Sequence, residues 1–338
     1  MKVLVTGGAG YIGGVVVAQL VHAGHDVLVY DNLSKGHRDA VPVASRLMVG
    51  DVGDRASLEA AFTAHQPEAV LHFASWIEAG ESMREPAKFF RNNTANALTL
   101  LETMLDHKVR CFVFSSTAAV YGDPERTPIR ESDPLVPTNA YGQSKLMVEQ
   151  MLAWFYRIHG LSYAALRYFN AAGATDALGE RHDPETHLIP IILQVAGGQR
   201  DRISIFGDDY PTPDGSCVRD YVHVSDLASA HLLALDALHA RPQPQQLIYN
   251  LGNGQGFSVK EVIDCARRVT GHPIPAVVEP RRAGDPATLV ARSAKIAAEL
   301  GWQPRTPGLE EIVRSAWEYL QRGNHSAEAP ACQAGKAQ

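Results

Sequence analysis

The stretch that decides the fold opens the chain and reads Val3-Leu4-Val5-Thr6-Gly7-Gly8-Ala9-Gly10-Tyr11-Ile12-Gly13. Its apolar beginning predicts a strand over Val3–Thr6, and the residues after it predict a helix over Ile12–Ala23. The glycines between the two have the spacing G-x-x-G-x-x-G, one residue looser than G-x-G-x-x-G. Glycines in this place let backbone N–H groups approach a pyrophosphate at the helix N-terminus. The stretch therefore predicts a dinucleotide-binding turn; a tight turn without a ligand is the plainer alternative.

Apolar runs and helical stretches keep alternating up to about residue 170. Further strands are expected at Val27–Tyr30, Arg46–Val49, Ala69–Phe73, Cys111–Ser115 and Tyr163–Leu166. Helices are expected at Ala56–Ala64, Pro86–His107 and Tyr141–His159. Because strands that alternate with helices form right-handed crossovers, the pattern predicts an α/β fold with a Rossmann-type, doubly wound parallel sheet.

The pattern loosens in the second half of the chain. Loops rich in Gly, Asp and Pro are expected at 173–190 and 207–219, and loops of that length are often functional. Later elements are expected at Val224–His239 (helix), Gln246–Leu251 (strand), Val259–Thr270 (helix capped by Ser258) and Leu309–Arg322 (helix). We expect a cofactor-binding domain over 1–175, to which about 220–252 returns, a smaller C-terminal substrate-binding domain over 176–322, and a frayed, disordered tail over 323–338.

Composition excludes several classes of protein. The 338 residues carry 31 Lys and Arg against 37 Asp and Glu, a net charge of −6 without the basic footprint of a nucleic-acid-binding protein. No apolar run reaches the roughly 18 residues of a membrane span, and no signal-peptide pattern precedes the first strand. The four cysteines lie far apart and favour neither disulfides nor a cysteine metal site: Cys111, Cys217, Cys265 and Cys332. These features predict a soluble, cytoplasmic protein without nucleic-acid or membrane partners.

The second expected strand ends in Tyr30-Asp31, about 20 residues after the glycine turn. An acidic side chain there accepts hydrogen bonds from ribose hydroxyls and repels a 2′-phosphate, so Asp31 predicts NAD rather than NADP. Asp51 follows the third strand. It is expected either at the adenine side of the cofactor or as a helix or turn cap.

A second group of residues points to acid–base chemistry. Tyr141-Gly142-Gln143-Ser144-Lys145 begins an expected helix, and residues four apart lie on one helical face. Because a neighbouring ammonium favours the phenolate, Lys145 makes Tyr141 a candidate general base. The preceding strand runs into Thr117, whose hydroxyl is expected at the same spot. In the plainer alternative Lys145 is a solvated charge and Thr117 is a strand-end cap.

Seven motifs in this order resemble the extended short-chain dehydrogenases/reductases: VTGGAGYIG, YDN, GDV, HFA, FSST, YGQSK and RYFN. Up to about residue 320 the chain is similar to the UDP-glucose 4-epimerases within that family. The most diagnostic segments lie in the second half, at 166–170, 179–190, 205–224 and 280–285.

The resemblance implies an isomerase that interconverts UDP-glucose and UDP-galactose, with a place in galactose and carbohydrate metabolism. Tightly held NAD+ would take hydride from sugar C4 while Tyr141, assisted by Thr117, removes the O4 proton. Lys145 would lower the pKa of the tyrosine and bind the nicotinamide ribose. The 4-ketose would then turn in the pocket and receive hydride on its other face.

Together with the glycine turn and Asp31, the resemblance implies these cofactor contacts: Gly7, Gly10, Tyr11, Ile12, Gly13, Asp31, Asn32, Asp51, Val52, Phe73, Ala74, Asn92, Tyr141, Lys145 and Phe169. It implies these contacts with the UDP-sugar: Thr117, Asn170, His187, Leu188, Ser204, Phe206, Arg219, Arg282, Asp285 and Leu289. Guanidinium forks suit a diphosphate, which favours Arg219 and Arg282, and Phe206 offers a stacking face for uracil. Surface ion pairs and core packing are the plainer alternatives for these three side chains.

Three departures from the family's pattern bear on function. Segment 75–78 (Ser-Trp-Ile-Glu) differs where relatives often carry Lys or Tyr near Ile77, so the cofactor contact there stays open. Many relatives have Ser at the position of Thr117, which keeps the hydroxyl. Ala118-Ala119 stand where related 4,6-dehydratases carry an Asp–Glu pair. Alanine supplies neither the acid nor the base of a dehydration, which argues against a dehydratase.

His182 and His187 share one loop, which is a weak sign of a metal site. No further ligands are expected to lie near them, so no metal is predicted. Glu180 and Asp183 are expected to cap the loop.

Two other functions stay open. One is 4-epimerisation of another UDP-sugar, such as UDP-GlcNAc/GalNAc, UDP-xylose/arabinose or a UDP-uronic acid, because Leu289 is smaller than the Tyr that family members confined to glucose and galactose can carry there. The other is a cofactor-sensing binding protein, against which the retained Tyr141 and Lys145 count. The resemblance also implies a homodimer through the helices at about 86–107 and 141–159.

Overall fold

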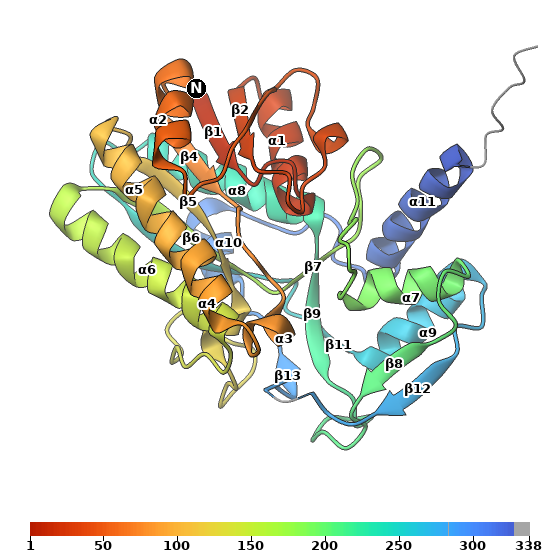
Figure 1. Cartoon of the computed structure of the whole chain (residues 1–338). Helices are drawn as coiled ribbons and strands as arrows, with labels where there is room; N and C mark the ends of the chain where they lie inside the picture. Colours follow the sequence, from red (N-terminus) through yellow and green to blue (C-terminus); the bar gives the residue numbers. More distant parts are fainter. Residues whose placement is uncertain (283, 328–338) are drawn as a thin grey trace, which may run out of the picture.

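Seven strands form a parallel central sheet in the order β10 (Gln246–Leu251), β6 (Ser162–Tyr168), β5 (Cys111–Thr117), β4 (Ala69–His72), β1 (Lys2–Thr6), β2 (Asp26–Asp31) and β3 (Arg46–Val49). Every neighbouring pair in this sheet is parallel. The computed structural model describes residues 1–282 and 284–327 (Figure 1). The predicted Rossmann-type, doubly wound sheet is confirmed, since the strand order reverses beside β1.

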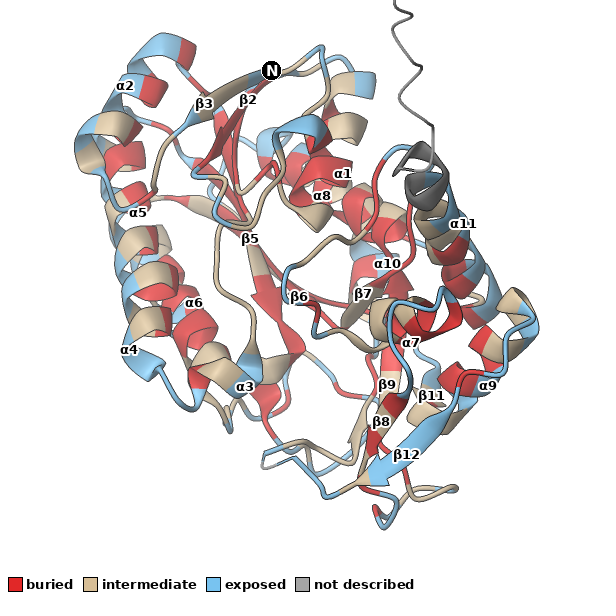
Figure 2. Ribbon diagram, turned by 45° about the vertical axis from the view of Figure 1, so that its right-hand side comes forward, coloured by how far each residue is buried: buried red, intermediate tan, exposed pale blue. Residues whose placement is uncertain are grey.

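Helices cover both faces of this sheet (Figure 1). One face carries α1 (Tyr11–His22) and α8 (Val224–His239), and α10 (Ala294–Leu300) packs against α8 and β10. The other face carries α2 (Arg55–His65), α5 (Asn96–Asp106) and α6 (Ala140–His159). Successive side chains of β1 point alternately to the two faces of the sheet. Val3 and Val5 pack in the α1–α8 core, and Leu4 packs in the α2–α5–α6 core. Buried residues accordingly line the sheet and the inner sides of the helices (Figure 2).

The segment predicted as one helix over Pro86–His107 is helical but not uniform. It comprises α4 (Pro86–Phe89), a π-helical stretch over Phe90–Ala95, and α5. Such stretches are often found at functional sites. This one carries Asn92 into the wall of the cavity described below.

A smaller second core is built from the C-terminal half. β9 (Val218–His223) pairs with β7 (Asn170–Ala172), β11 (Gly256–Ser258) and β13 (Thr288–Leu289), while β8 (Ile203–Phe206) pairs with β12 (Ala276–Glu279). Helices α7 (Leu188–Ala196), α9 (Val259–Thr270) and α11 (Leu309–Ala327) pack with β8 and β9. This smaller C-terminal unit agrees with the expected fold class. Helix α8 and strand β10 lie in the sheet unit.

Several short elements fall where the sequence predicted only loops or nothing. α7 begins inside the expected loop 173–190, and β9 begins inside the expected loop 207–219. The short strands β7, β8, β11, β12 and β13 and the helices α3 (Ala79–Ser82) and α10 were not predicted, nor were the 3-10 turns Arg38–Ala40 and Ala118–Tyr121. The last helix runs to Ala327 rather than Arg322, so the expected tail begins too early, and its remainder, 328–338, lies outside the described residues.

Within residues 1–282 and 284–327, no helix combines the length and the apolar character needed to cross a membrane. Cys111, Cys217 and Cys265 are buried free thiols. Cys332 lies outside the described part of the chain.

Candidate active site

A cavity of about 400 Å³ lies at the carboxyl ends of the central strands, where ligands bind in open α/β sheets. Its wall combines residues that follow β1, β2, β4 and β5 with residues of the smaller unit, from the segment between β7 and α7 and from β9 and β13. The predicted cofactor residues in this wall are Gly7, Gly10, Tyr11, Ile12, Gly13, Asp31, Asn32, Asp51, Val52, Phe73, Ala74, Asn92, Tyr141 and Phe169. Two distant parts of the sequence therefore share one cavity.

The glycine turn leaves the N-terminus of α1 open toward this cavity. Gly7 has φ +74°, and a side chain there would bring its Cβ within 2.4 Å of the Ala74 backbone nitrogen. A Cβ on Gly13 would lie 2.3 Å from the carbonyl oxygen of Gly7. Gly10 is the N-cap of α1 and supplies no capping side chain. The first N–H groups of α1 are thus available to an anion, as a dinucleotide diphosphate requires.

Asp31 and Asp51 stand on the same side of the cavity. The Asp31 carboxylate is buried, accepts hydrogen bonds from the backbone N–H of Ala9 (3.0 Å) and Leu33 (2.8 Å), and has its pKa raised by that burial. Asp51 accepts from the Asn32 side chain (2.7 Å) and from the Gly53 N–H (2.8 Å). Asp51 is therefore a turn cap that also lines the cavity, and its two expected roles do not exclude each other.

The Thr117 and Tyr141 side chains are hydrogen-bonded to each other, and both residues line the cavity. Thr117 ends β5, and Tyr141 lies in the first turn of α6, which Asn139 caps by accepting from the Gly142 N–H (2.8 Å). Burial raises the pKa of Tyr141 to about 12; the hydrogen bond with Thr117 opposes that rise, and the charge of Glu78 adds to it. The phenol is therefore protonated at neutral pH in this geometry.

Lys145 lies deeper than expected. Its Nζ donates to the carbonyl oxygen of Ser115 (2.8 Å) and sits 4.9 Å from the centre of the Phe114 ring. Burial lowers its pKa to about 7. Lys145 is not among the residues that line the cavity. Its expected roles, to lower the pKa of Tyr141 and to bind the nicotinamide ribose, stay predictions.

The predicted substrate contacts separate into two groups. Those in the cavity wall are Thr117, Asn170, His187, Leu188, Arg219 and Leu289. Those outside it are Ser204, Phe206, Arg282 and Asp285. Asp285 is nevertheless next to the wall, because its carboxylate accepts from Arg219 (2.8 Å). The guanidinium of Arg282 lies 3.7 Å from the centre of the Phe206 ring, so it covers one face that was expected to stack on uracil.

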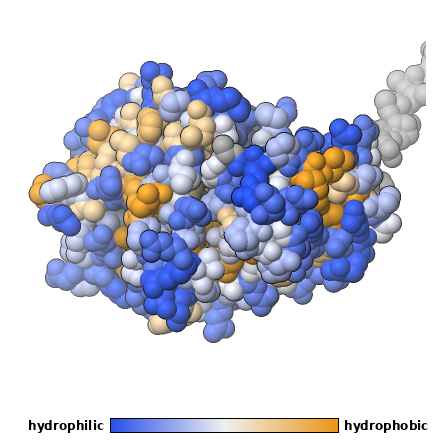
Figure 3. Space-filling model, turned by 90° about the horizontal axis from the view of Figure 1, so that it is seen from below, coloured by the Kyte–Doolittle hydropathy of each residue, from blue (hydrophilic) through white to orange (hydrophobic). Residues whose placement is uncertain are grey.

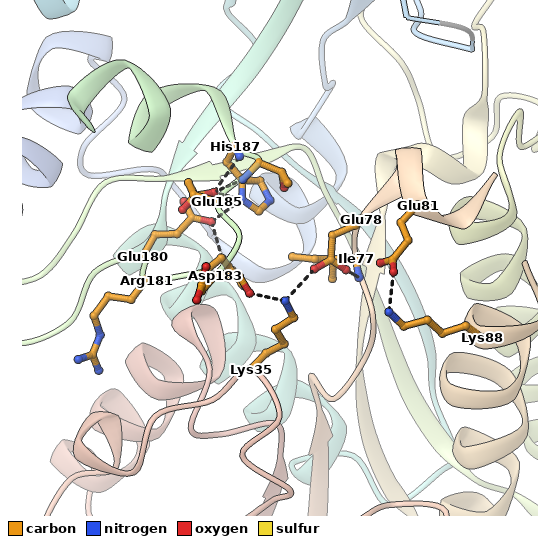
Figure 4. Close-up of polar contacts among 12 residues, drawn as sticks. Lys35, Ile77, Glu78, Glu81, Lys88, Glu180, Arg181, Asp183, Glu185 and His187 are labelled. Carbon is orange, nitrogen blue, oxygen red and sulfur yellow. Dashed lines mark hydrogen bonds and ion pairs between the residues drawn. The ribbon is translucent and has the colours of Figure 1, made fainter. Parts of the chain in front are cut away.

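The departing segment 75–78 lines the cavity, and two lysines that the sequence analysis did not name lie beside it. The Trp76 indole lies 3.8 Å beneath the Lys88 ammonium. Lys35 Nζ lies 3.7 Å from the Glu78 carboxylate and donates to the Asp183 carbonyl oxygen (2.6 Å), as Figure 4 shows. Lys35, Trp76 and Glu78 all line the cavity. Lys35 lies four residues after Asp31, and this position is the sequence signal that could have placed Lys35 near the cofactor.

The two loop histidines have acidic neighbours, contrary to expectation. His187 Nδ1 lies 2.8 Å from Glu180 and 2.9 Å from Glu185, and His182 Nδ1 lies 3.0 Å from Glu180 (Figure 4). Burial disfavours a charge on His187, but the two carboxylates overcome it and raise its pKa to about 10. The expectation that no further ligand groups lie near the histidines is therefore wrong.

Known proteins resemble the chain over nearly its full length. The model of the family described as "NAD dependent epimerase/dehydratase family" matches residues 3–252. A UDP-glucose 4-epimerase of Halalkalibacterium halodurans is 53% identical over 96% of this chain and 97% of the relative. The crystal structure of UDP-glucose 4-epimerase from Brucella ovis in complex with NAD is 44% identical, covers 94% of this chain and 97% of its own, and has a TM-score of 0.90. The structure of the UDP-Glc/GlcNAc 4-epimerase from Campylobacter jejuni is 42% identical, covers 95% and 99%, and has a TM-score of 0.83.

Proposed function

The chain belongs to the NAD dependent epimerase/dehydratase family, and from that premise we propose that it interconverts UDP-glucose and UDP-galactose. The reaction proceeds by transient oxidation at sugar C4 with NAD as the cofactor. The observation that carries the proposal is the meeting of the Thr117 and Tyr141 hydroxyls in a cavity that also holds an open helix N-terminus. A cofactor sensor has no use for that hydroxyl pair.

The residues present fit NAD. The glycine turn and the N-terminus of α1 would hold its diphosphate, and Asp31 would hold the adenosine ribose. When bound, NAD+ would accept the hydride that leaves sugar C4, and it would bring a positive charge at its nicotinamide end. A positive charge near Tyr141 would favour the phenolate and oppose the rise in its pKa that burial causes.

The proton chemistry belongs to the chain itself. Tyr141 takes the O4 proton while the C4–H bond breaks with its electron pair, and the Thr117 hydroxyl bridges sugar O4 and the phenol. A C4 ketone results. When the ketose has turned over, Tyr141 returns its proton to O4 as hydride arrives at the opposite face of C4. Nothing is oxidised or reduced overall.

We propose that Arg219 binds the diphosphate of the UDP-sugar. Its guanidinium lies in the cavity wall and donates to Asp285 (2.8 Å) and to the Val218 carbonyl oxygen (2.9 Å). A guanidinium has five N–H donors, so others can meet phosphate oxygens. Asp285 holds the fork in place. Incubation of the purified protein with UDP-galactose alone tests the proposed function: UDP-glucose should form up to equilibrium, and an unchanged substrate would contradict it.

Asp31→Ser is expected to narrow the preference for NAD over NADP, because it removes a negative charge from the place of a 2′-phosphate. Dissociation constants of both cofactors, measured by titration calorimetry, check this. Asp26→Ser is the matched control, since Asp26 begins the same strand and is exposed beside Arg46. Equal affinity of the wild type for the two cofactors would refute the role of Asp31.

The position of Leu289 favours a second activity, the 4-epimerisation of UDP-GlcNAc. Strand β13 places Leu289 opposite Arg219 in a parallel pair, and its side chain lines the cavity. The relative from Campylobacter jejuni is a UDP-Glc/GlcNAc 4-epimerase. We propose that Leu289 leaves room for a 2-acetamido group when the ketose turns.

Leu289→Tyr is therefore expected to suppress turnover of UDP-GlcNAc while sparing UDP-galactose. Values of kcat/KM for the two sugars, measured side by side, decide this. Leu289→Met keeps the volume and should retain both activities. Absence of wild-type activity on UDP-GlcNAc, or equal losses on both sugars in Leu289→Tyr, would show that position 289 is not the gate.

We also propose a homodimer through α5 and α6. Met147, Trp154 and Ile158 follow one another along α6 at spacings of seven and four residues, and Leu98 stands on α5. All four are exposed, Trp154 by 61% and Ile158 by 68%. Seen from below, apolar atoms gather on the left, the side on which Figure 1 shows these helices (Figure 3). Exposed apolar patches of this kind mark association surfaces.

Trp154→Glu is accordingly expected to convert dimer to monomer in light scattering after gel filtration, because it buries a charge in the proposed interface. Val43→Glu is the control, since Val43 is an exposed apolar residue outside α5 and α6. A wild-type monomer, or a dimer that tolerates Trp154→Glu, would disprove this interface.

The same proposal includes a place in galactose metabolism in the cytoplasm. UDP-galactose is the substrate proposed above. Cys111, Cys217 and Cys265, which are free and buried, fit a reducing compartment.

A further inference from the structure

Four side chains between β7 and α7 converge on one point at the cavity wall. We propose that Glu180, His182, Glu185 and His187 bind one divalent ion of the zinc class. The inference is independent of the proposed function, because it rests on these four groups alone.

The spacing of the donor atoms fits a single ion. One nitrogen from each histidine and one oxygen from each glutamate all lie within 4.8 Å of one another. His187 Nδ1 lies 2.8 Å from Glu180 and 2.9 Å from Glu185, and His182 Nδ1 lies 3.0 Å from Glu180. Zinc bonds to imidazole nitrogen and carboxylate oxygen of roughly 2.0–2.2 Å place tetrahedral neighbours about 3.3–3.5 Å apart. Around an ion these three pairs would move apart by a few tenths of an ångström, and any pair near the 4.8 Å limit would close by more than about 1 Å.

The acidic side chains are held before any ion arrives. The side chains of Glu180 and Glu185 are only 7% and 3% exposed. Backbone N–H groups of Thr186 (2.7 Å) and His187 (2.8 Å) donate to the Glu185 carboxylate and fix its orientation. Outer hydrogen bonds of this kind are typical of built metal sites.

Charge balance also favours an ion at this point. His187 Nδ1 carries at most one proton, yet it faces carboxylate oxygens from both Glu180 and Glu185. Glu185 also accepts from two backbone N–H groups, and His182 Nδ1 faces Glu180, so the carboxylates already have hydrogen-bond donors. What an ion would balance is their charge, since two nearly buried carboxylates carry two negative charges. Buried charges are paired or coordinate metals. One divalent ion satisfies all four donors at once.

The donor set also indicates the kind of ion and its role. Imidazole nitrogen suits zinc, cobalt and nickel, whereas magnesium and calcium prefer oxygen throughout. Four protein ligands leave no open position, which is typical of a structural rather than a catalytic centre.

An ion here would lock a segment that spans the two units. Lys35 of the sheet unit donates to the Asp183 carbonyl oxygen (Figure 4). Arg181 forms an ion pair with Asp39 of the sheet unit (2.8 Å). His187 is the N-cap of α7, and Glu180, His182 and His187 line the cavity. The ion would fix the wall against which the ligand lies.

Metal content of the full-length protein tests the proposal. After stripping with a chelator and reloading with Zn²⁺ alone, the wild type should retain one zinc per chain in elemental analysis, with a raised melting temperature. Co²⁺ in its place should give the visible bands of a four-coordinate site. His182→Gln and Glu185→Gln should each weaken the affinity for zinc at least tenfold, measured against a competing chelator, and should lose the cobalt bands.

His239→Gln is the matched control, since His239 is an exposed histidine at the end of α8. Circular dichroism checks that each variant folds, and either cluster variant suffices if the other does not. Two results would overturn the proposal: zinc retained by the wild type at less than one equivalent, or zinc and cobalt signals that are the same in the cluster variants and in His239→Gln. Either would mean that the four side chains form a metal-free ion-pair cluster.

Discussion

Tyr141→Phe is expected to lower the turnover of UDP-galactose by about 10²–10⁴-fold, the range typical of a lost acid–base group. The variant lacks only the hydroxyl that exchanges a proton with sugar O4. Its ring still fills the same place in the first turn of α6. Folding and NAD binding should therefore stay close to those of the wild type. Single-turnover and steady-state kinetics, with NAD content measured on the same sample, check this.

Tyr156→Phe is the control, because it makes the same chemical change in the same helix, where Tyr156 packs on the α2–α5–α6 core instead of the cavity. It should turn over at the wild-type rate. A Tyr141→Phe variant as fast as the wild type would remove Tyr141 from the chemistry. Loss of NAD together with activity would instead assign it to cofactor binding.

Arg167→Leu is expected to lower the free energy of unfolding by about 3–5 kcal/mol, because it leaves the buried carboxylate of Glu149 without its guanidinium partner. Arg167 on β6 binds Glu149 on α6 through two hydrogen bonds of 2.6 and 3.0 Å, and the two side chains are 2% and 4% exposed. Ser116 on β5 also donates to Glu149 (2.5 Å). Glu149 thus joins both β6 and β5, the strand that carries Thr117, to the helix that carries Tyr141. Urea unfolding measures the loss.

The double variant Glu149→Leu/Arg167→Leu separates ion pairing from packing. Removing both charges leaves no unpaired charge, although the Ser116 hydroxyl loses its acceptor. The double variant should therefore be more stable than Arg167→Leu by more than about 1 kcal/mol, on the order expected for replaced buried pairs. A double variant that loses as much as the sum of both single changes would show that the side-chain volumes, and not the charges, hold these elements together.

Elements with local signals were predicted best from the sequence. The helix Val259–Thr270, predicted with Ser258 as its cap, has its predicted bounds. Ser258 and Glu261 form a capping box, in which each side chain accepts from the other residue's N–H. Strand β8 was missed because its pairing partner is β12, about 70 residues later in the chain, where Ile203 stands opposite Ala276. A strand of four residues shows too little alternation of apolar and polar side chains to be predicted without its pairing strand.

The residues of the candidate site likewise differ in how far the sequence could predict their positions. The glycine turn, Asp31, Thr117 and Tyr141 follow sheet strands, so their meeting at one edge was predictable from topology. The grouping of Glu180 and Glu185 around His187 depends on how one irregular segment folds back on itself, and spacing alone does not encode that. The burial of Lys145 depends likewise on its packing against β5. The sequence shows only that Lys145 lies one helical turn after Tyr141, and that spacing does not reveal how far the side chain is buried.

The most direct test of the proposed chemistry follows the hydrogen at C4. UDP-galactose deuterated at C4 is incubated in ordinary water with the purified protein as it carries its own cofactor, without added NAD, and the UDP-glucose formed is examined by NMR and mass spectrometry. Because the hydride leaves and returns within one closed cavity, the product should keep deuterium at C4, with none appearing in solvent and no net accumulation of reduced cofactor. UDP-glucose that carries solvent hydrogen at C4, or an oxidised sugar formed in step with reduced cofactor, would contradict transient oxidation at C4.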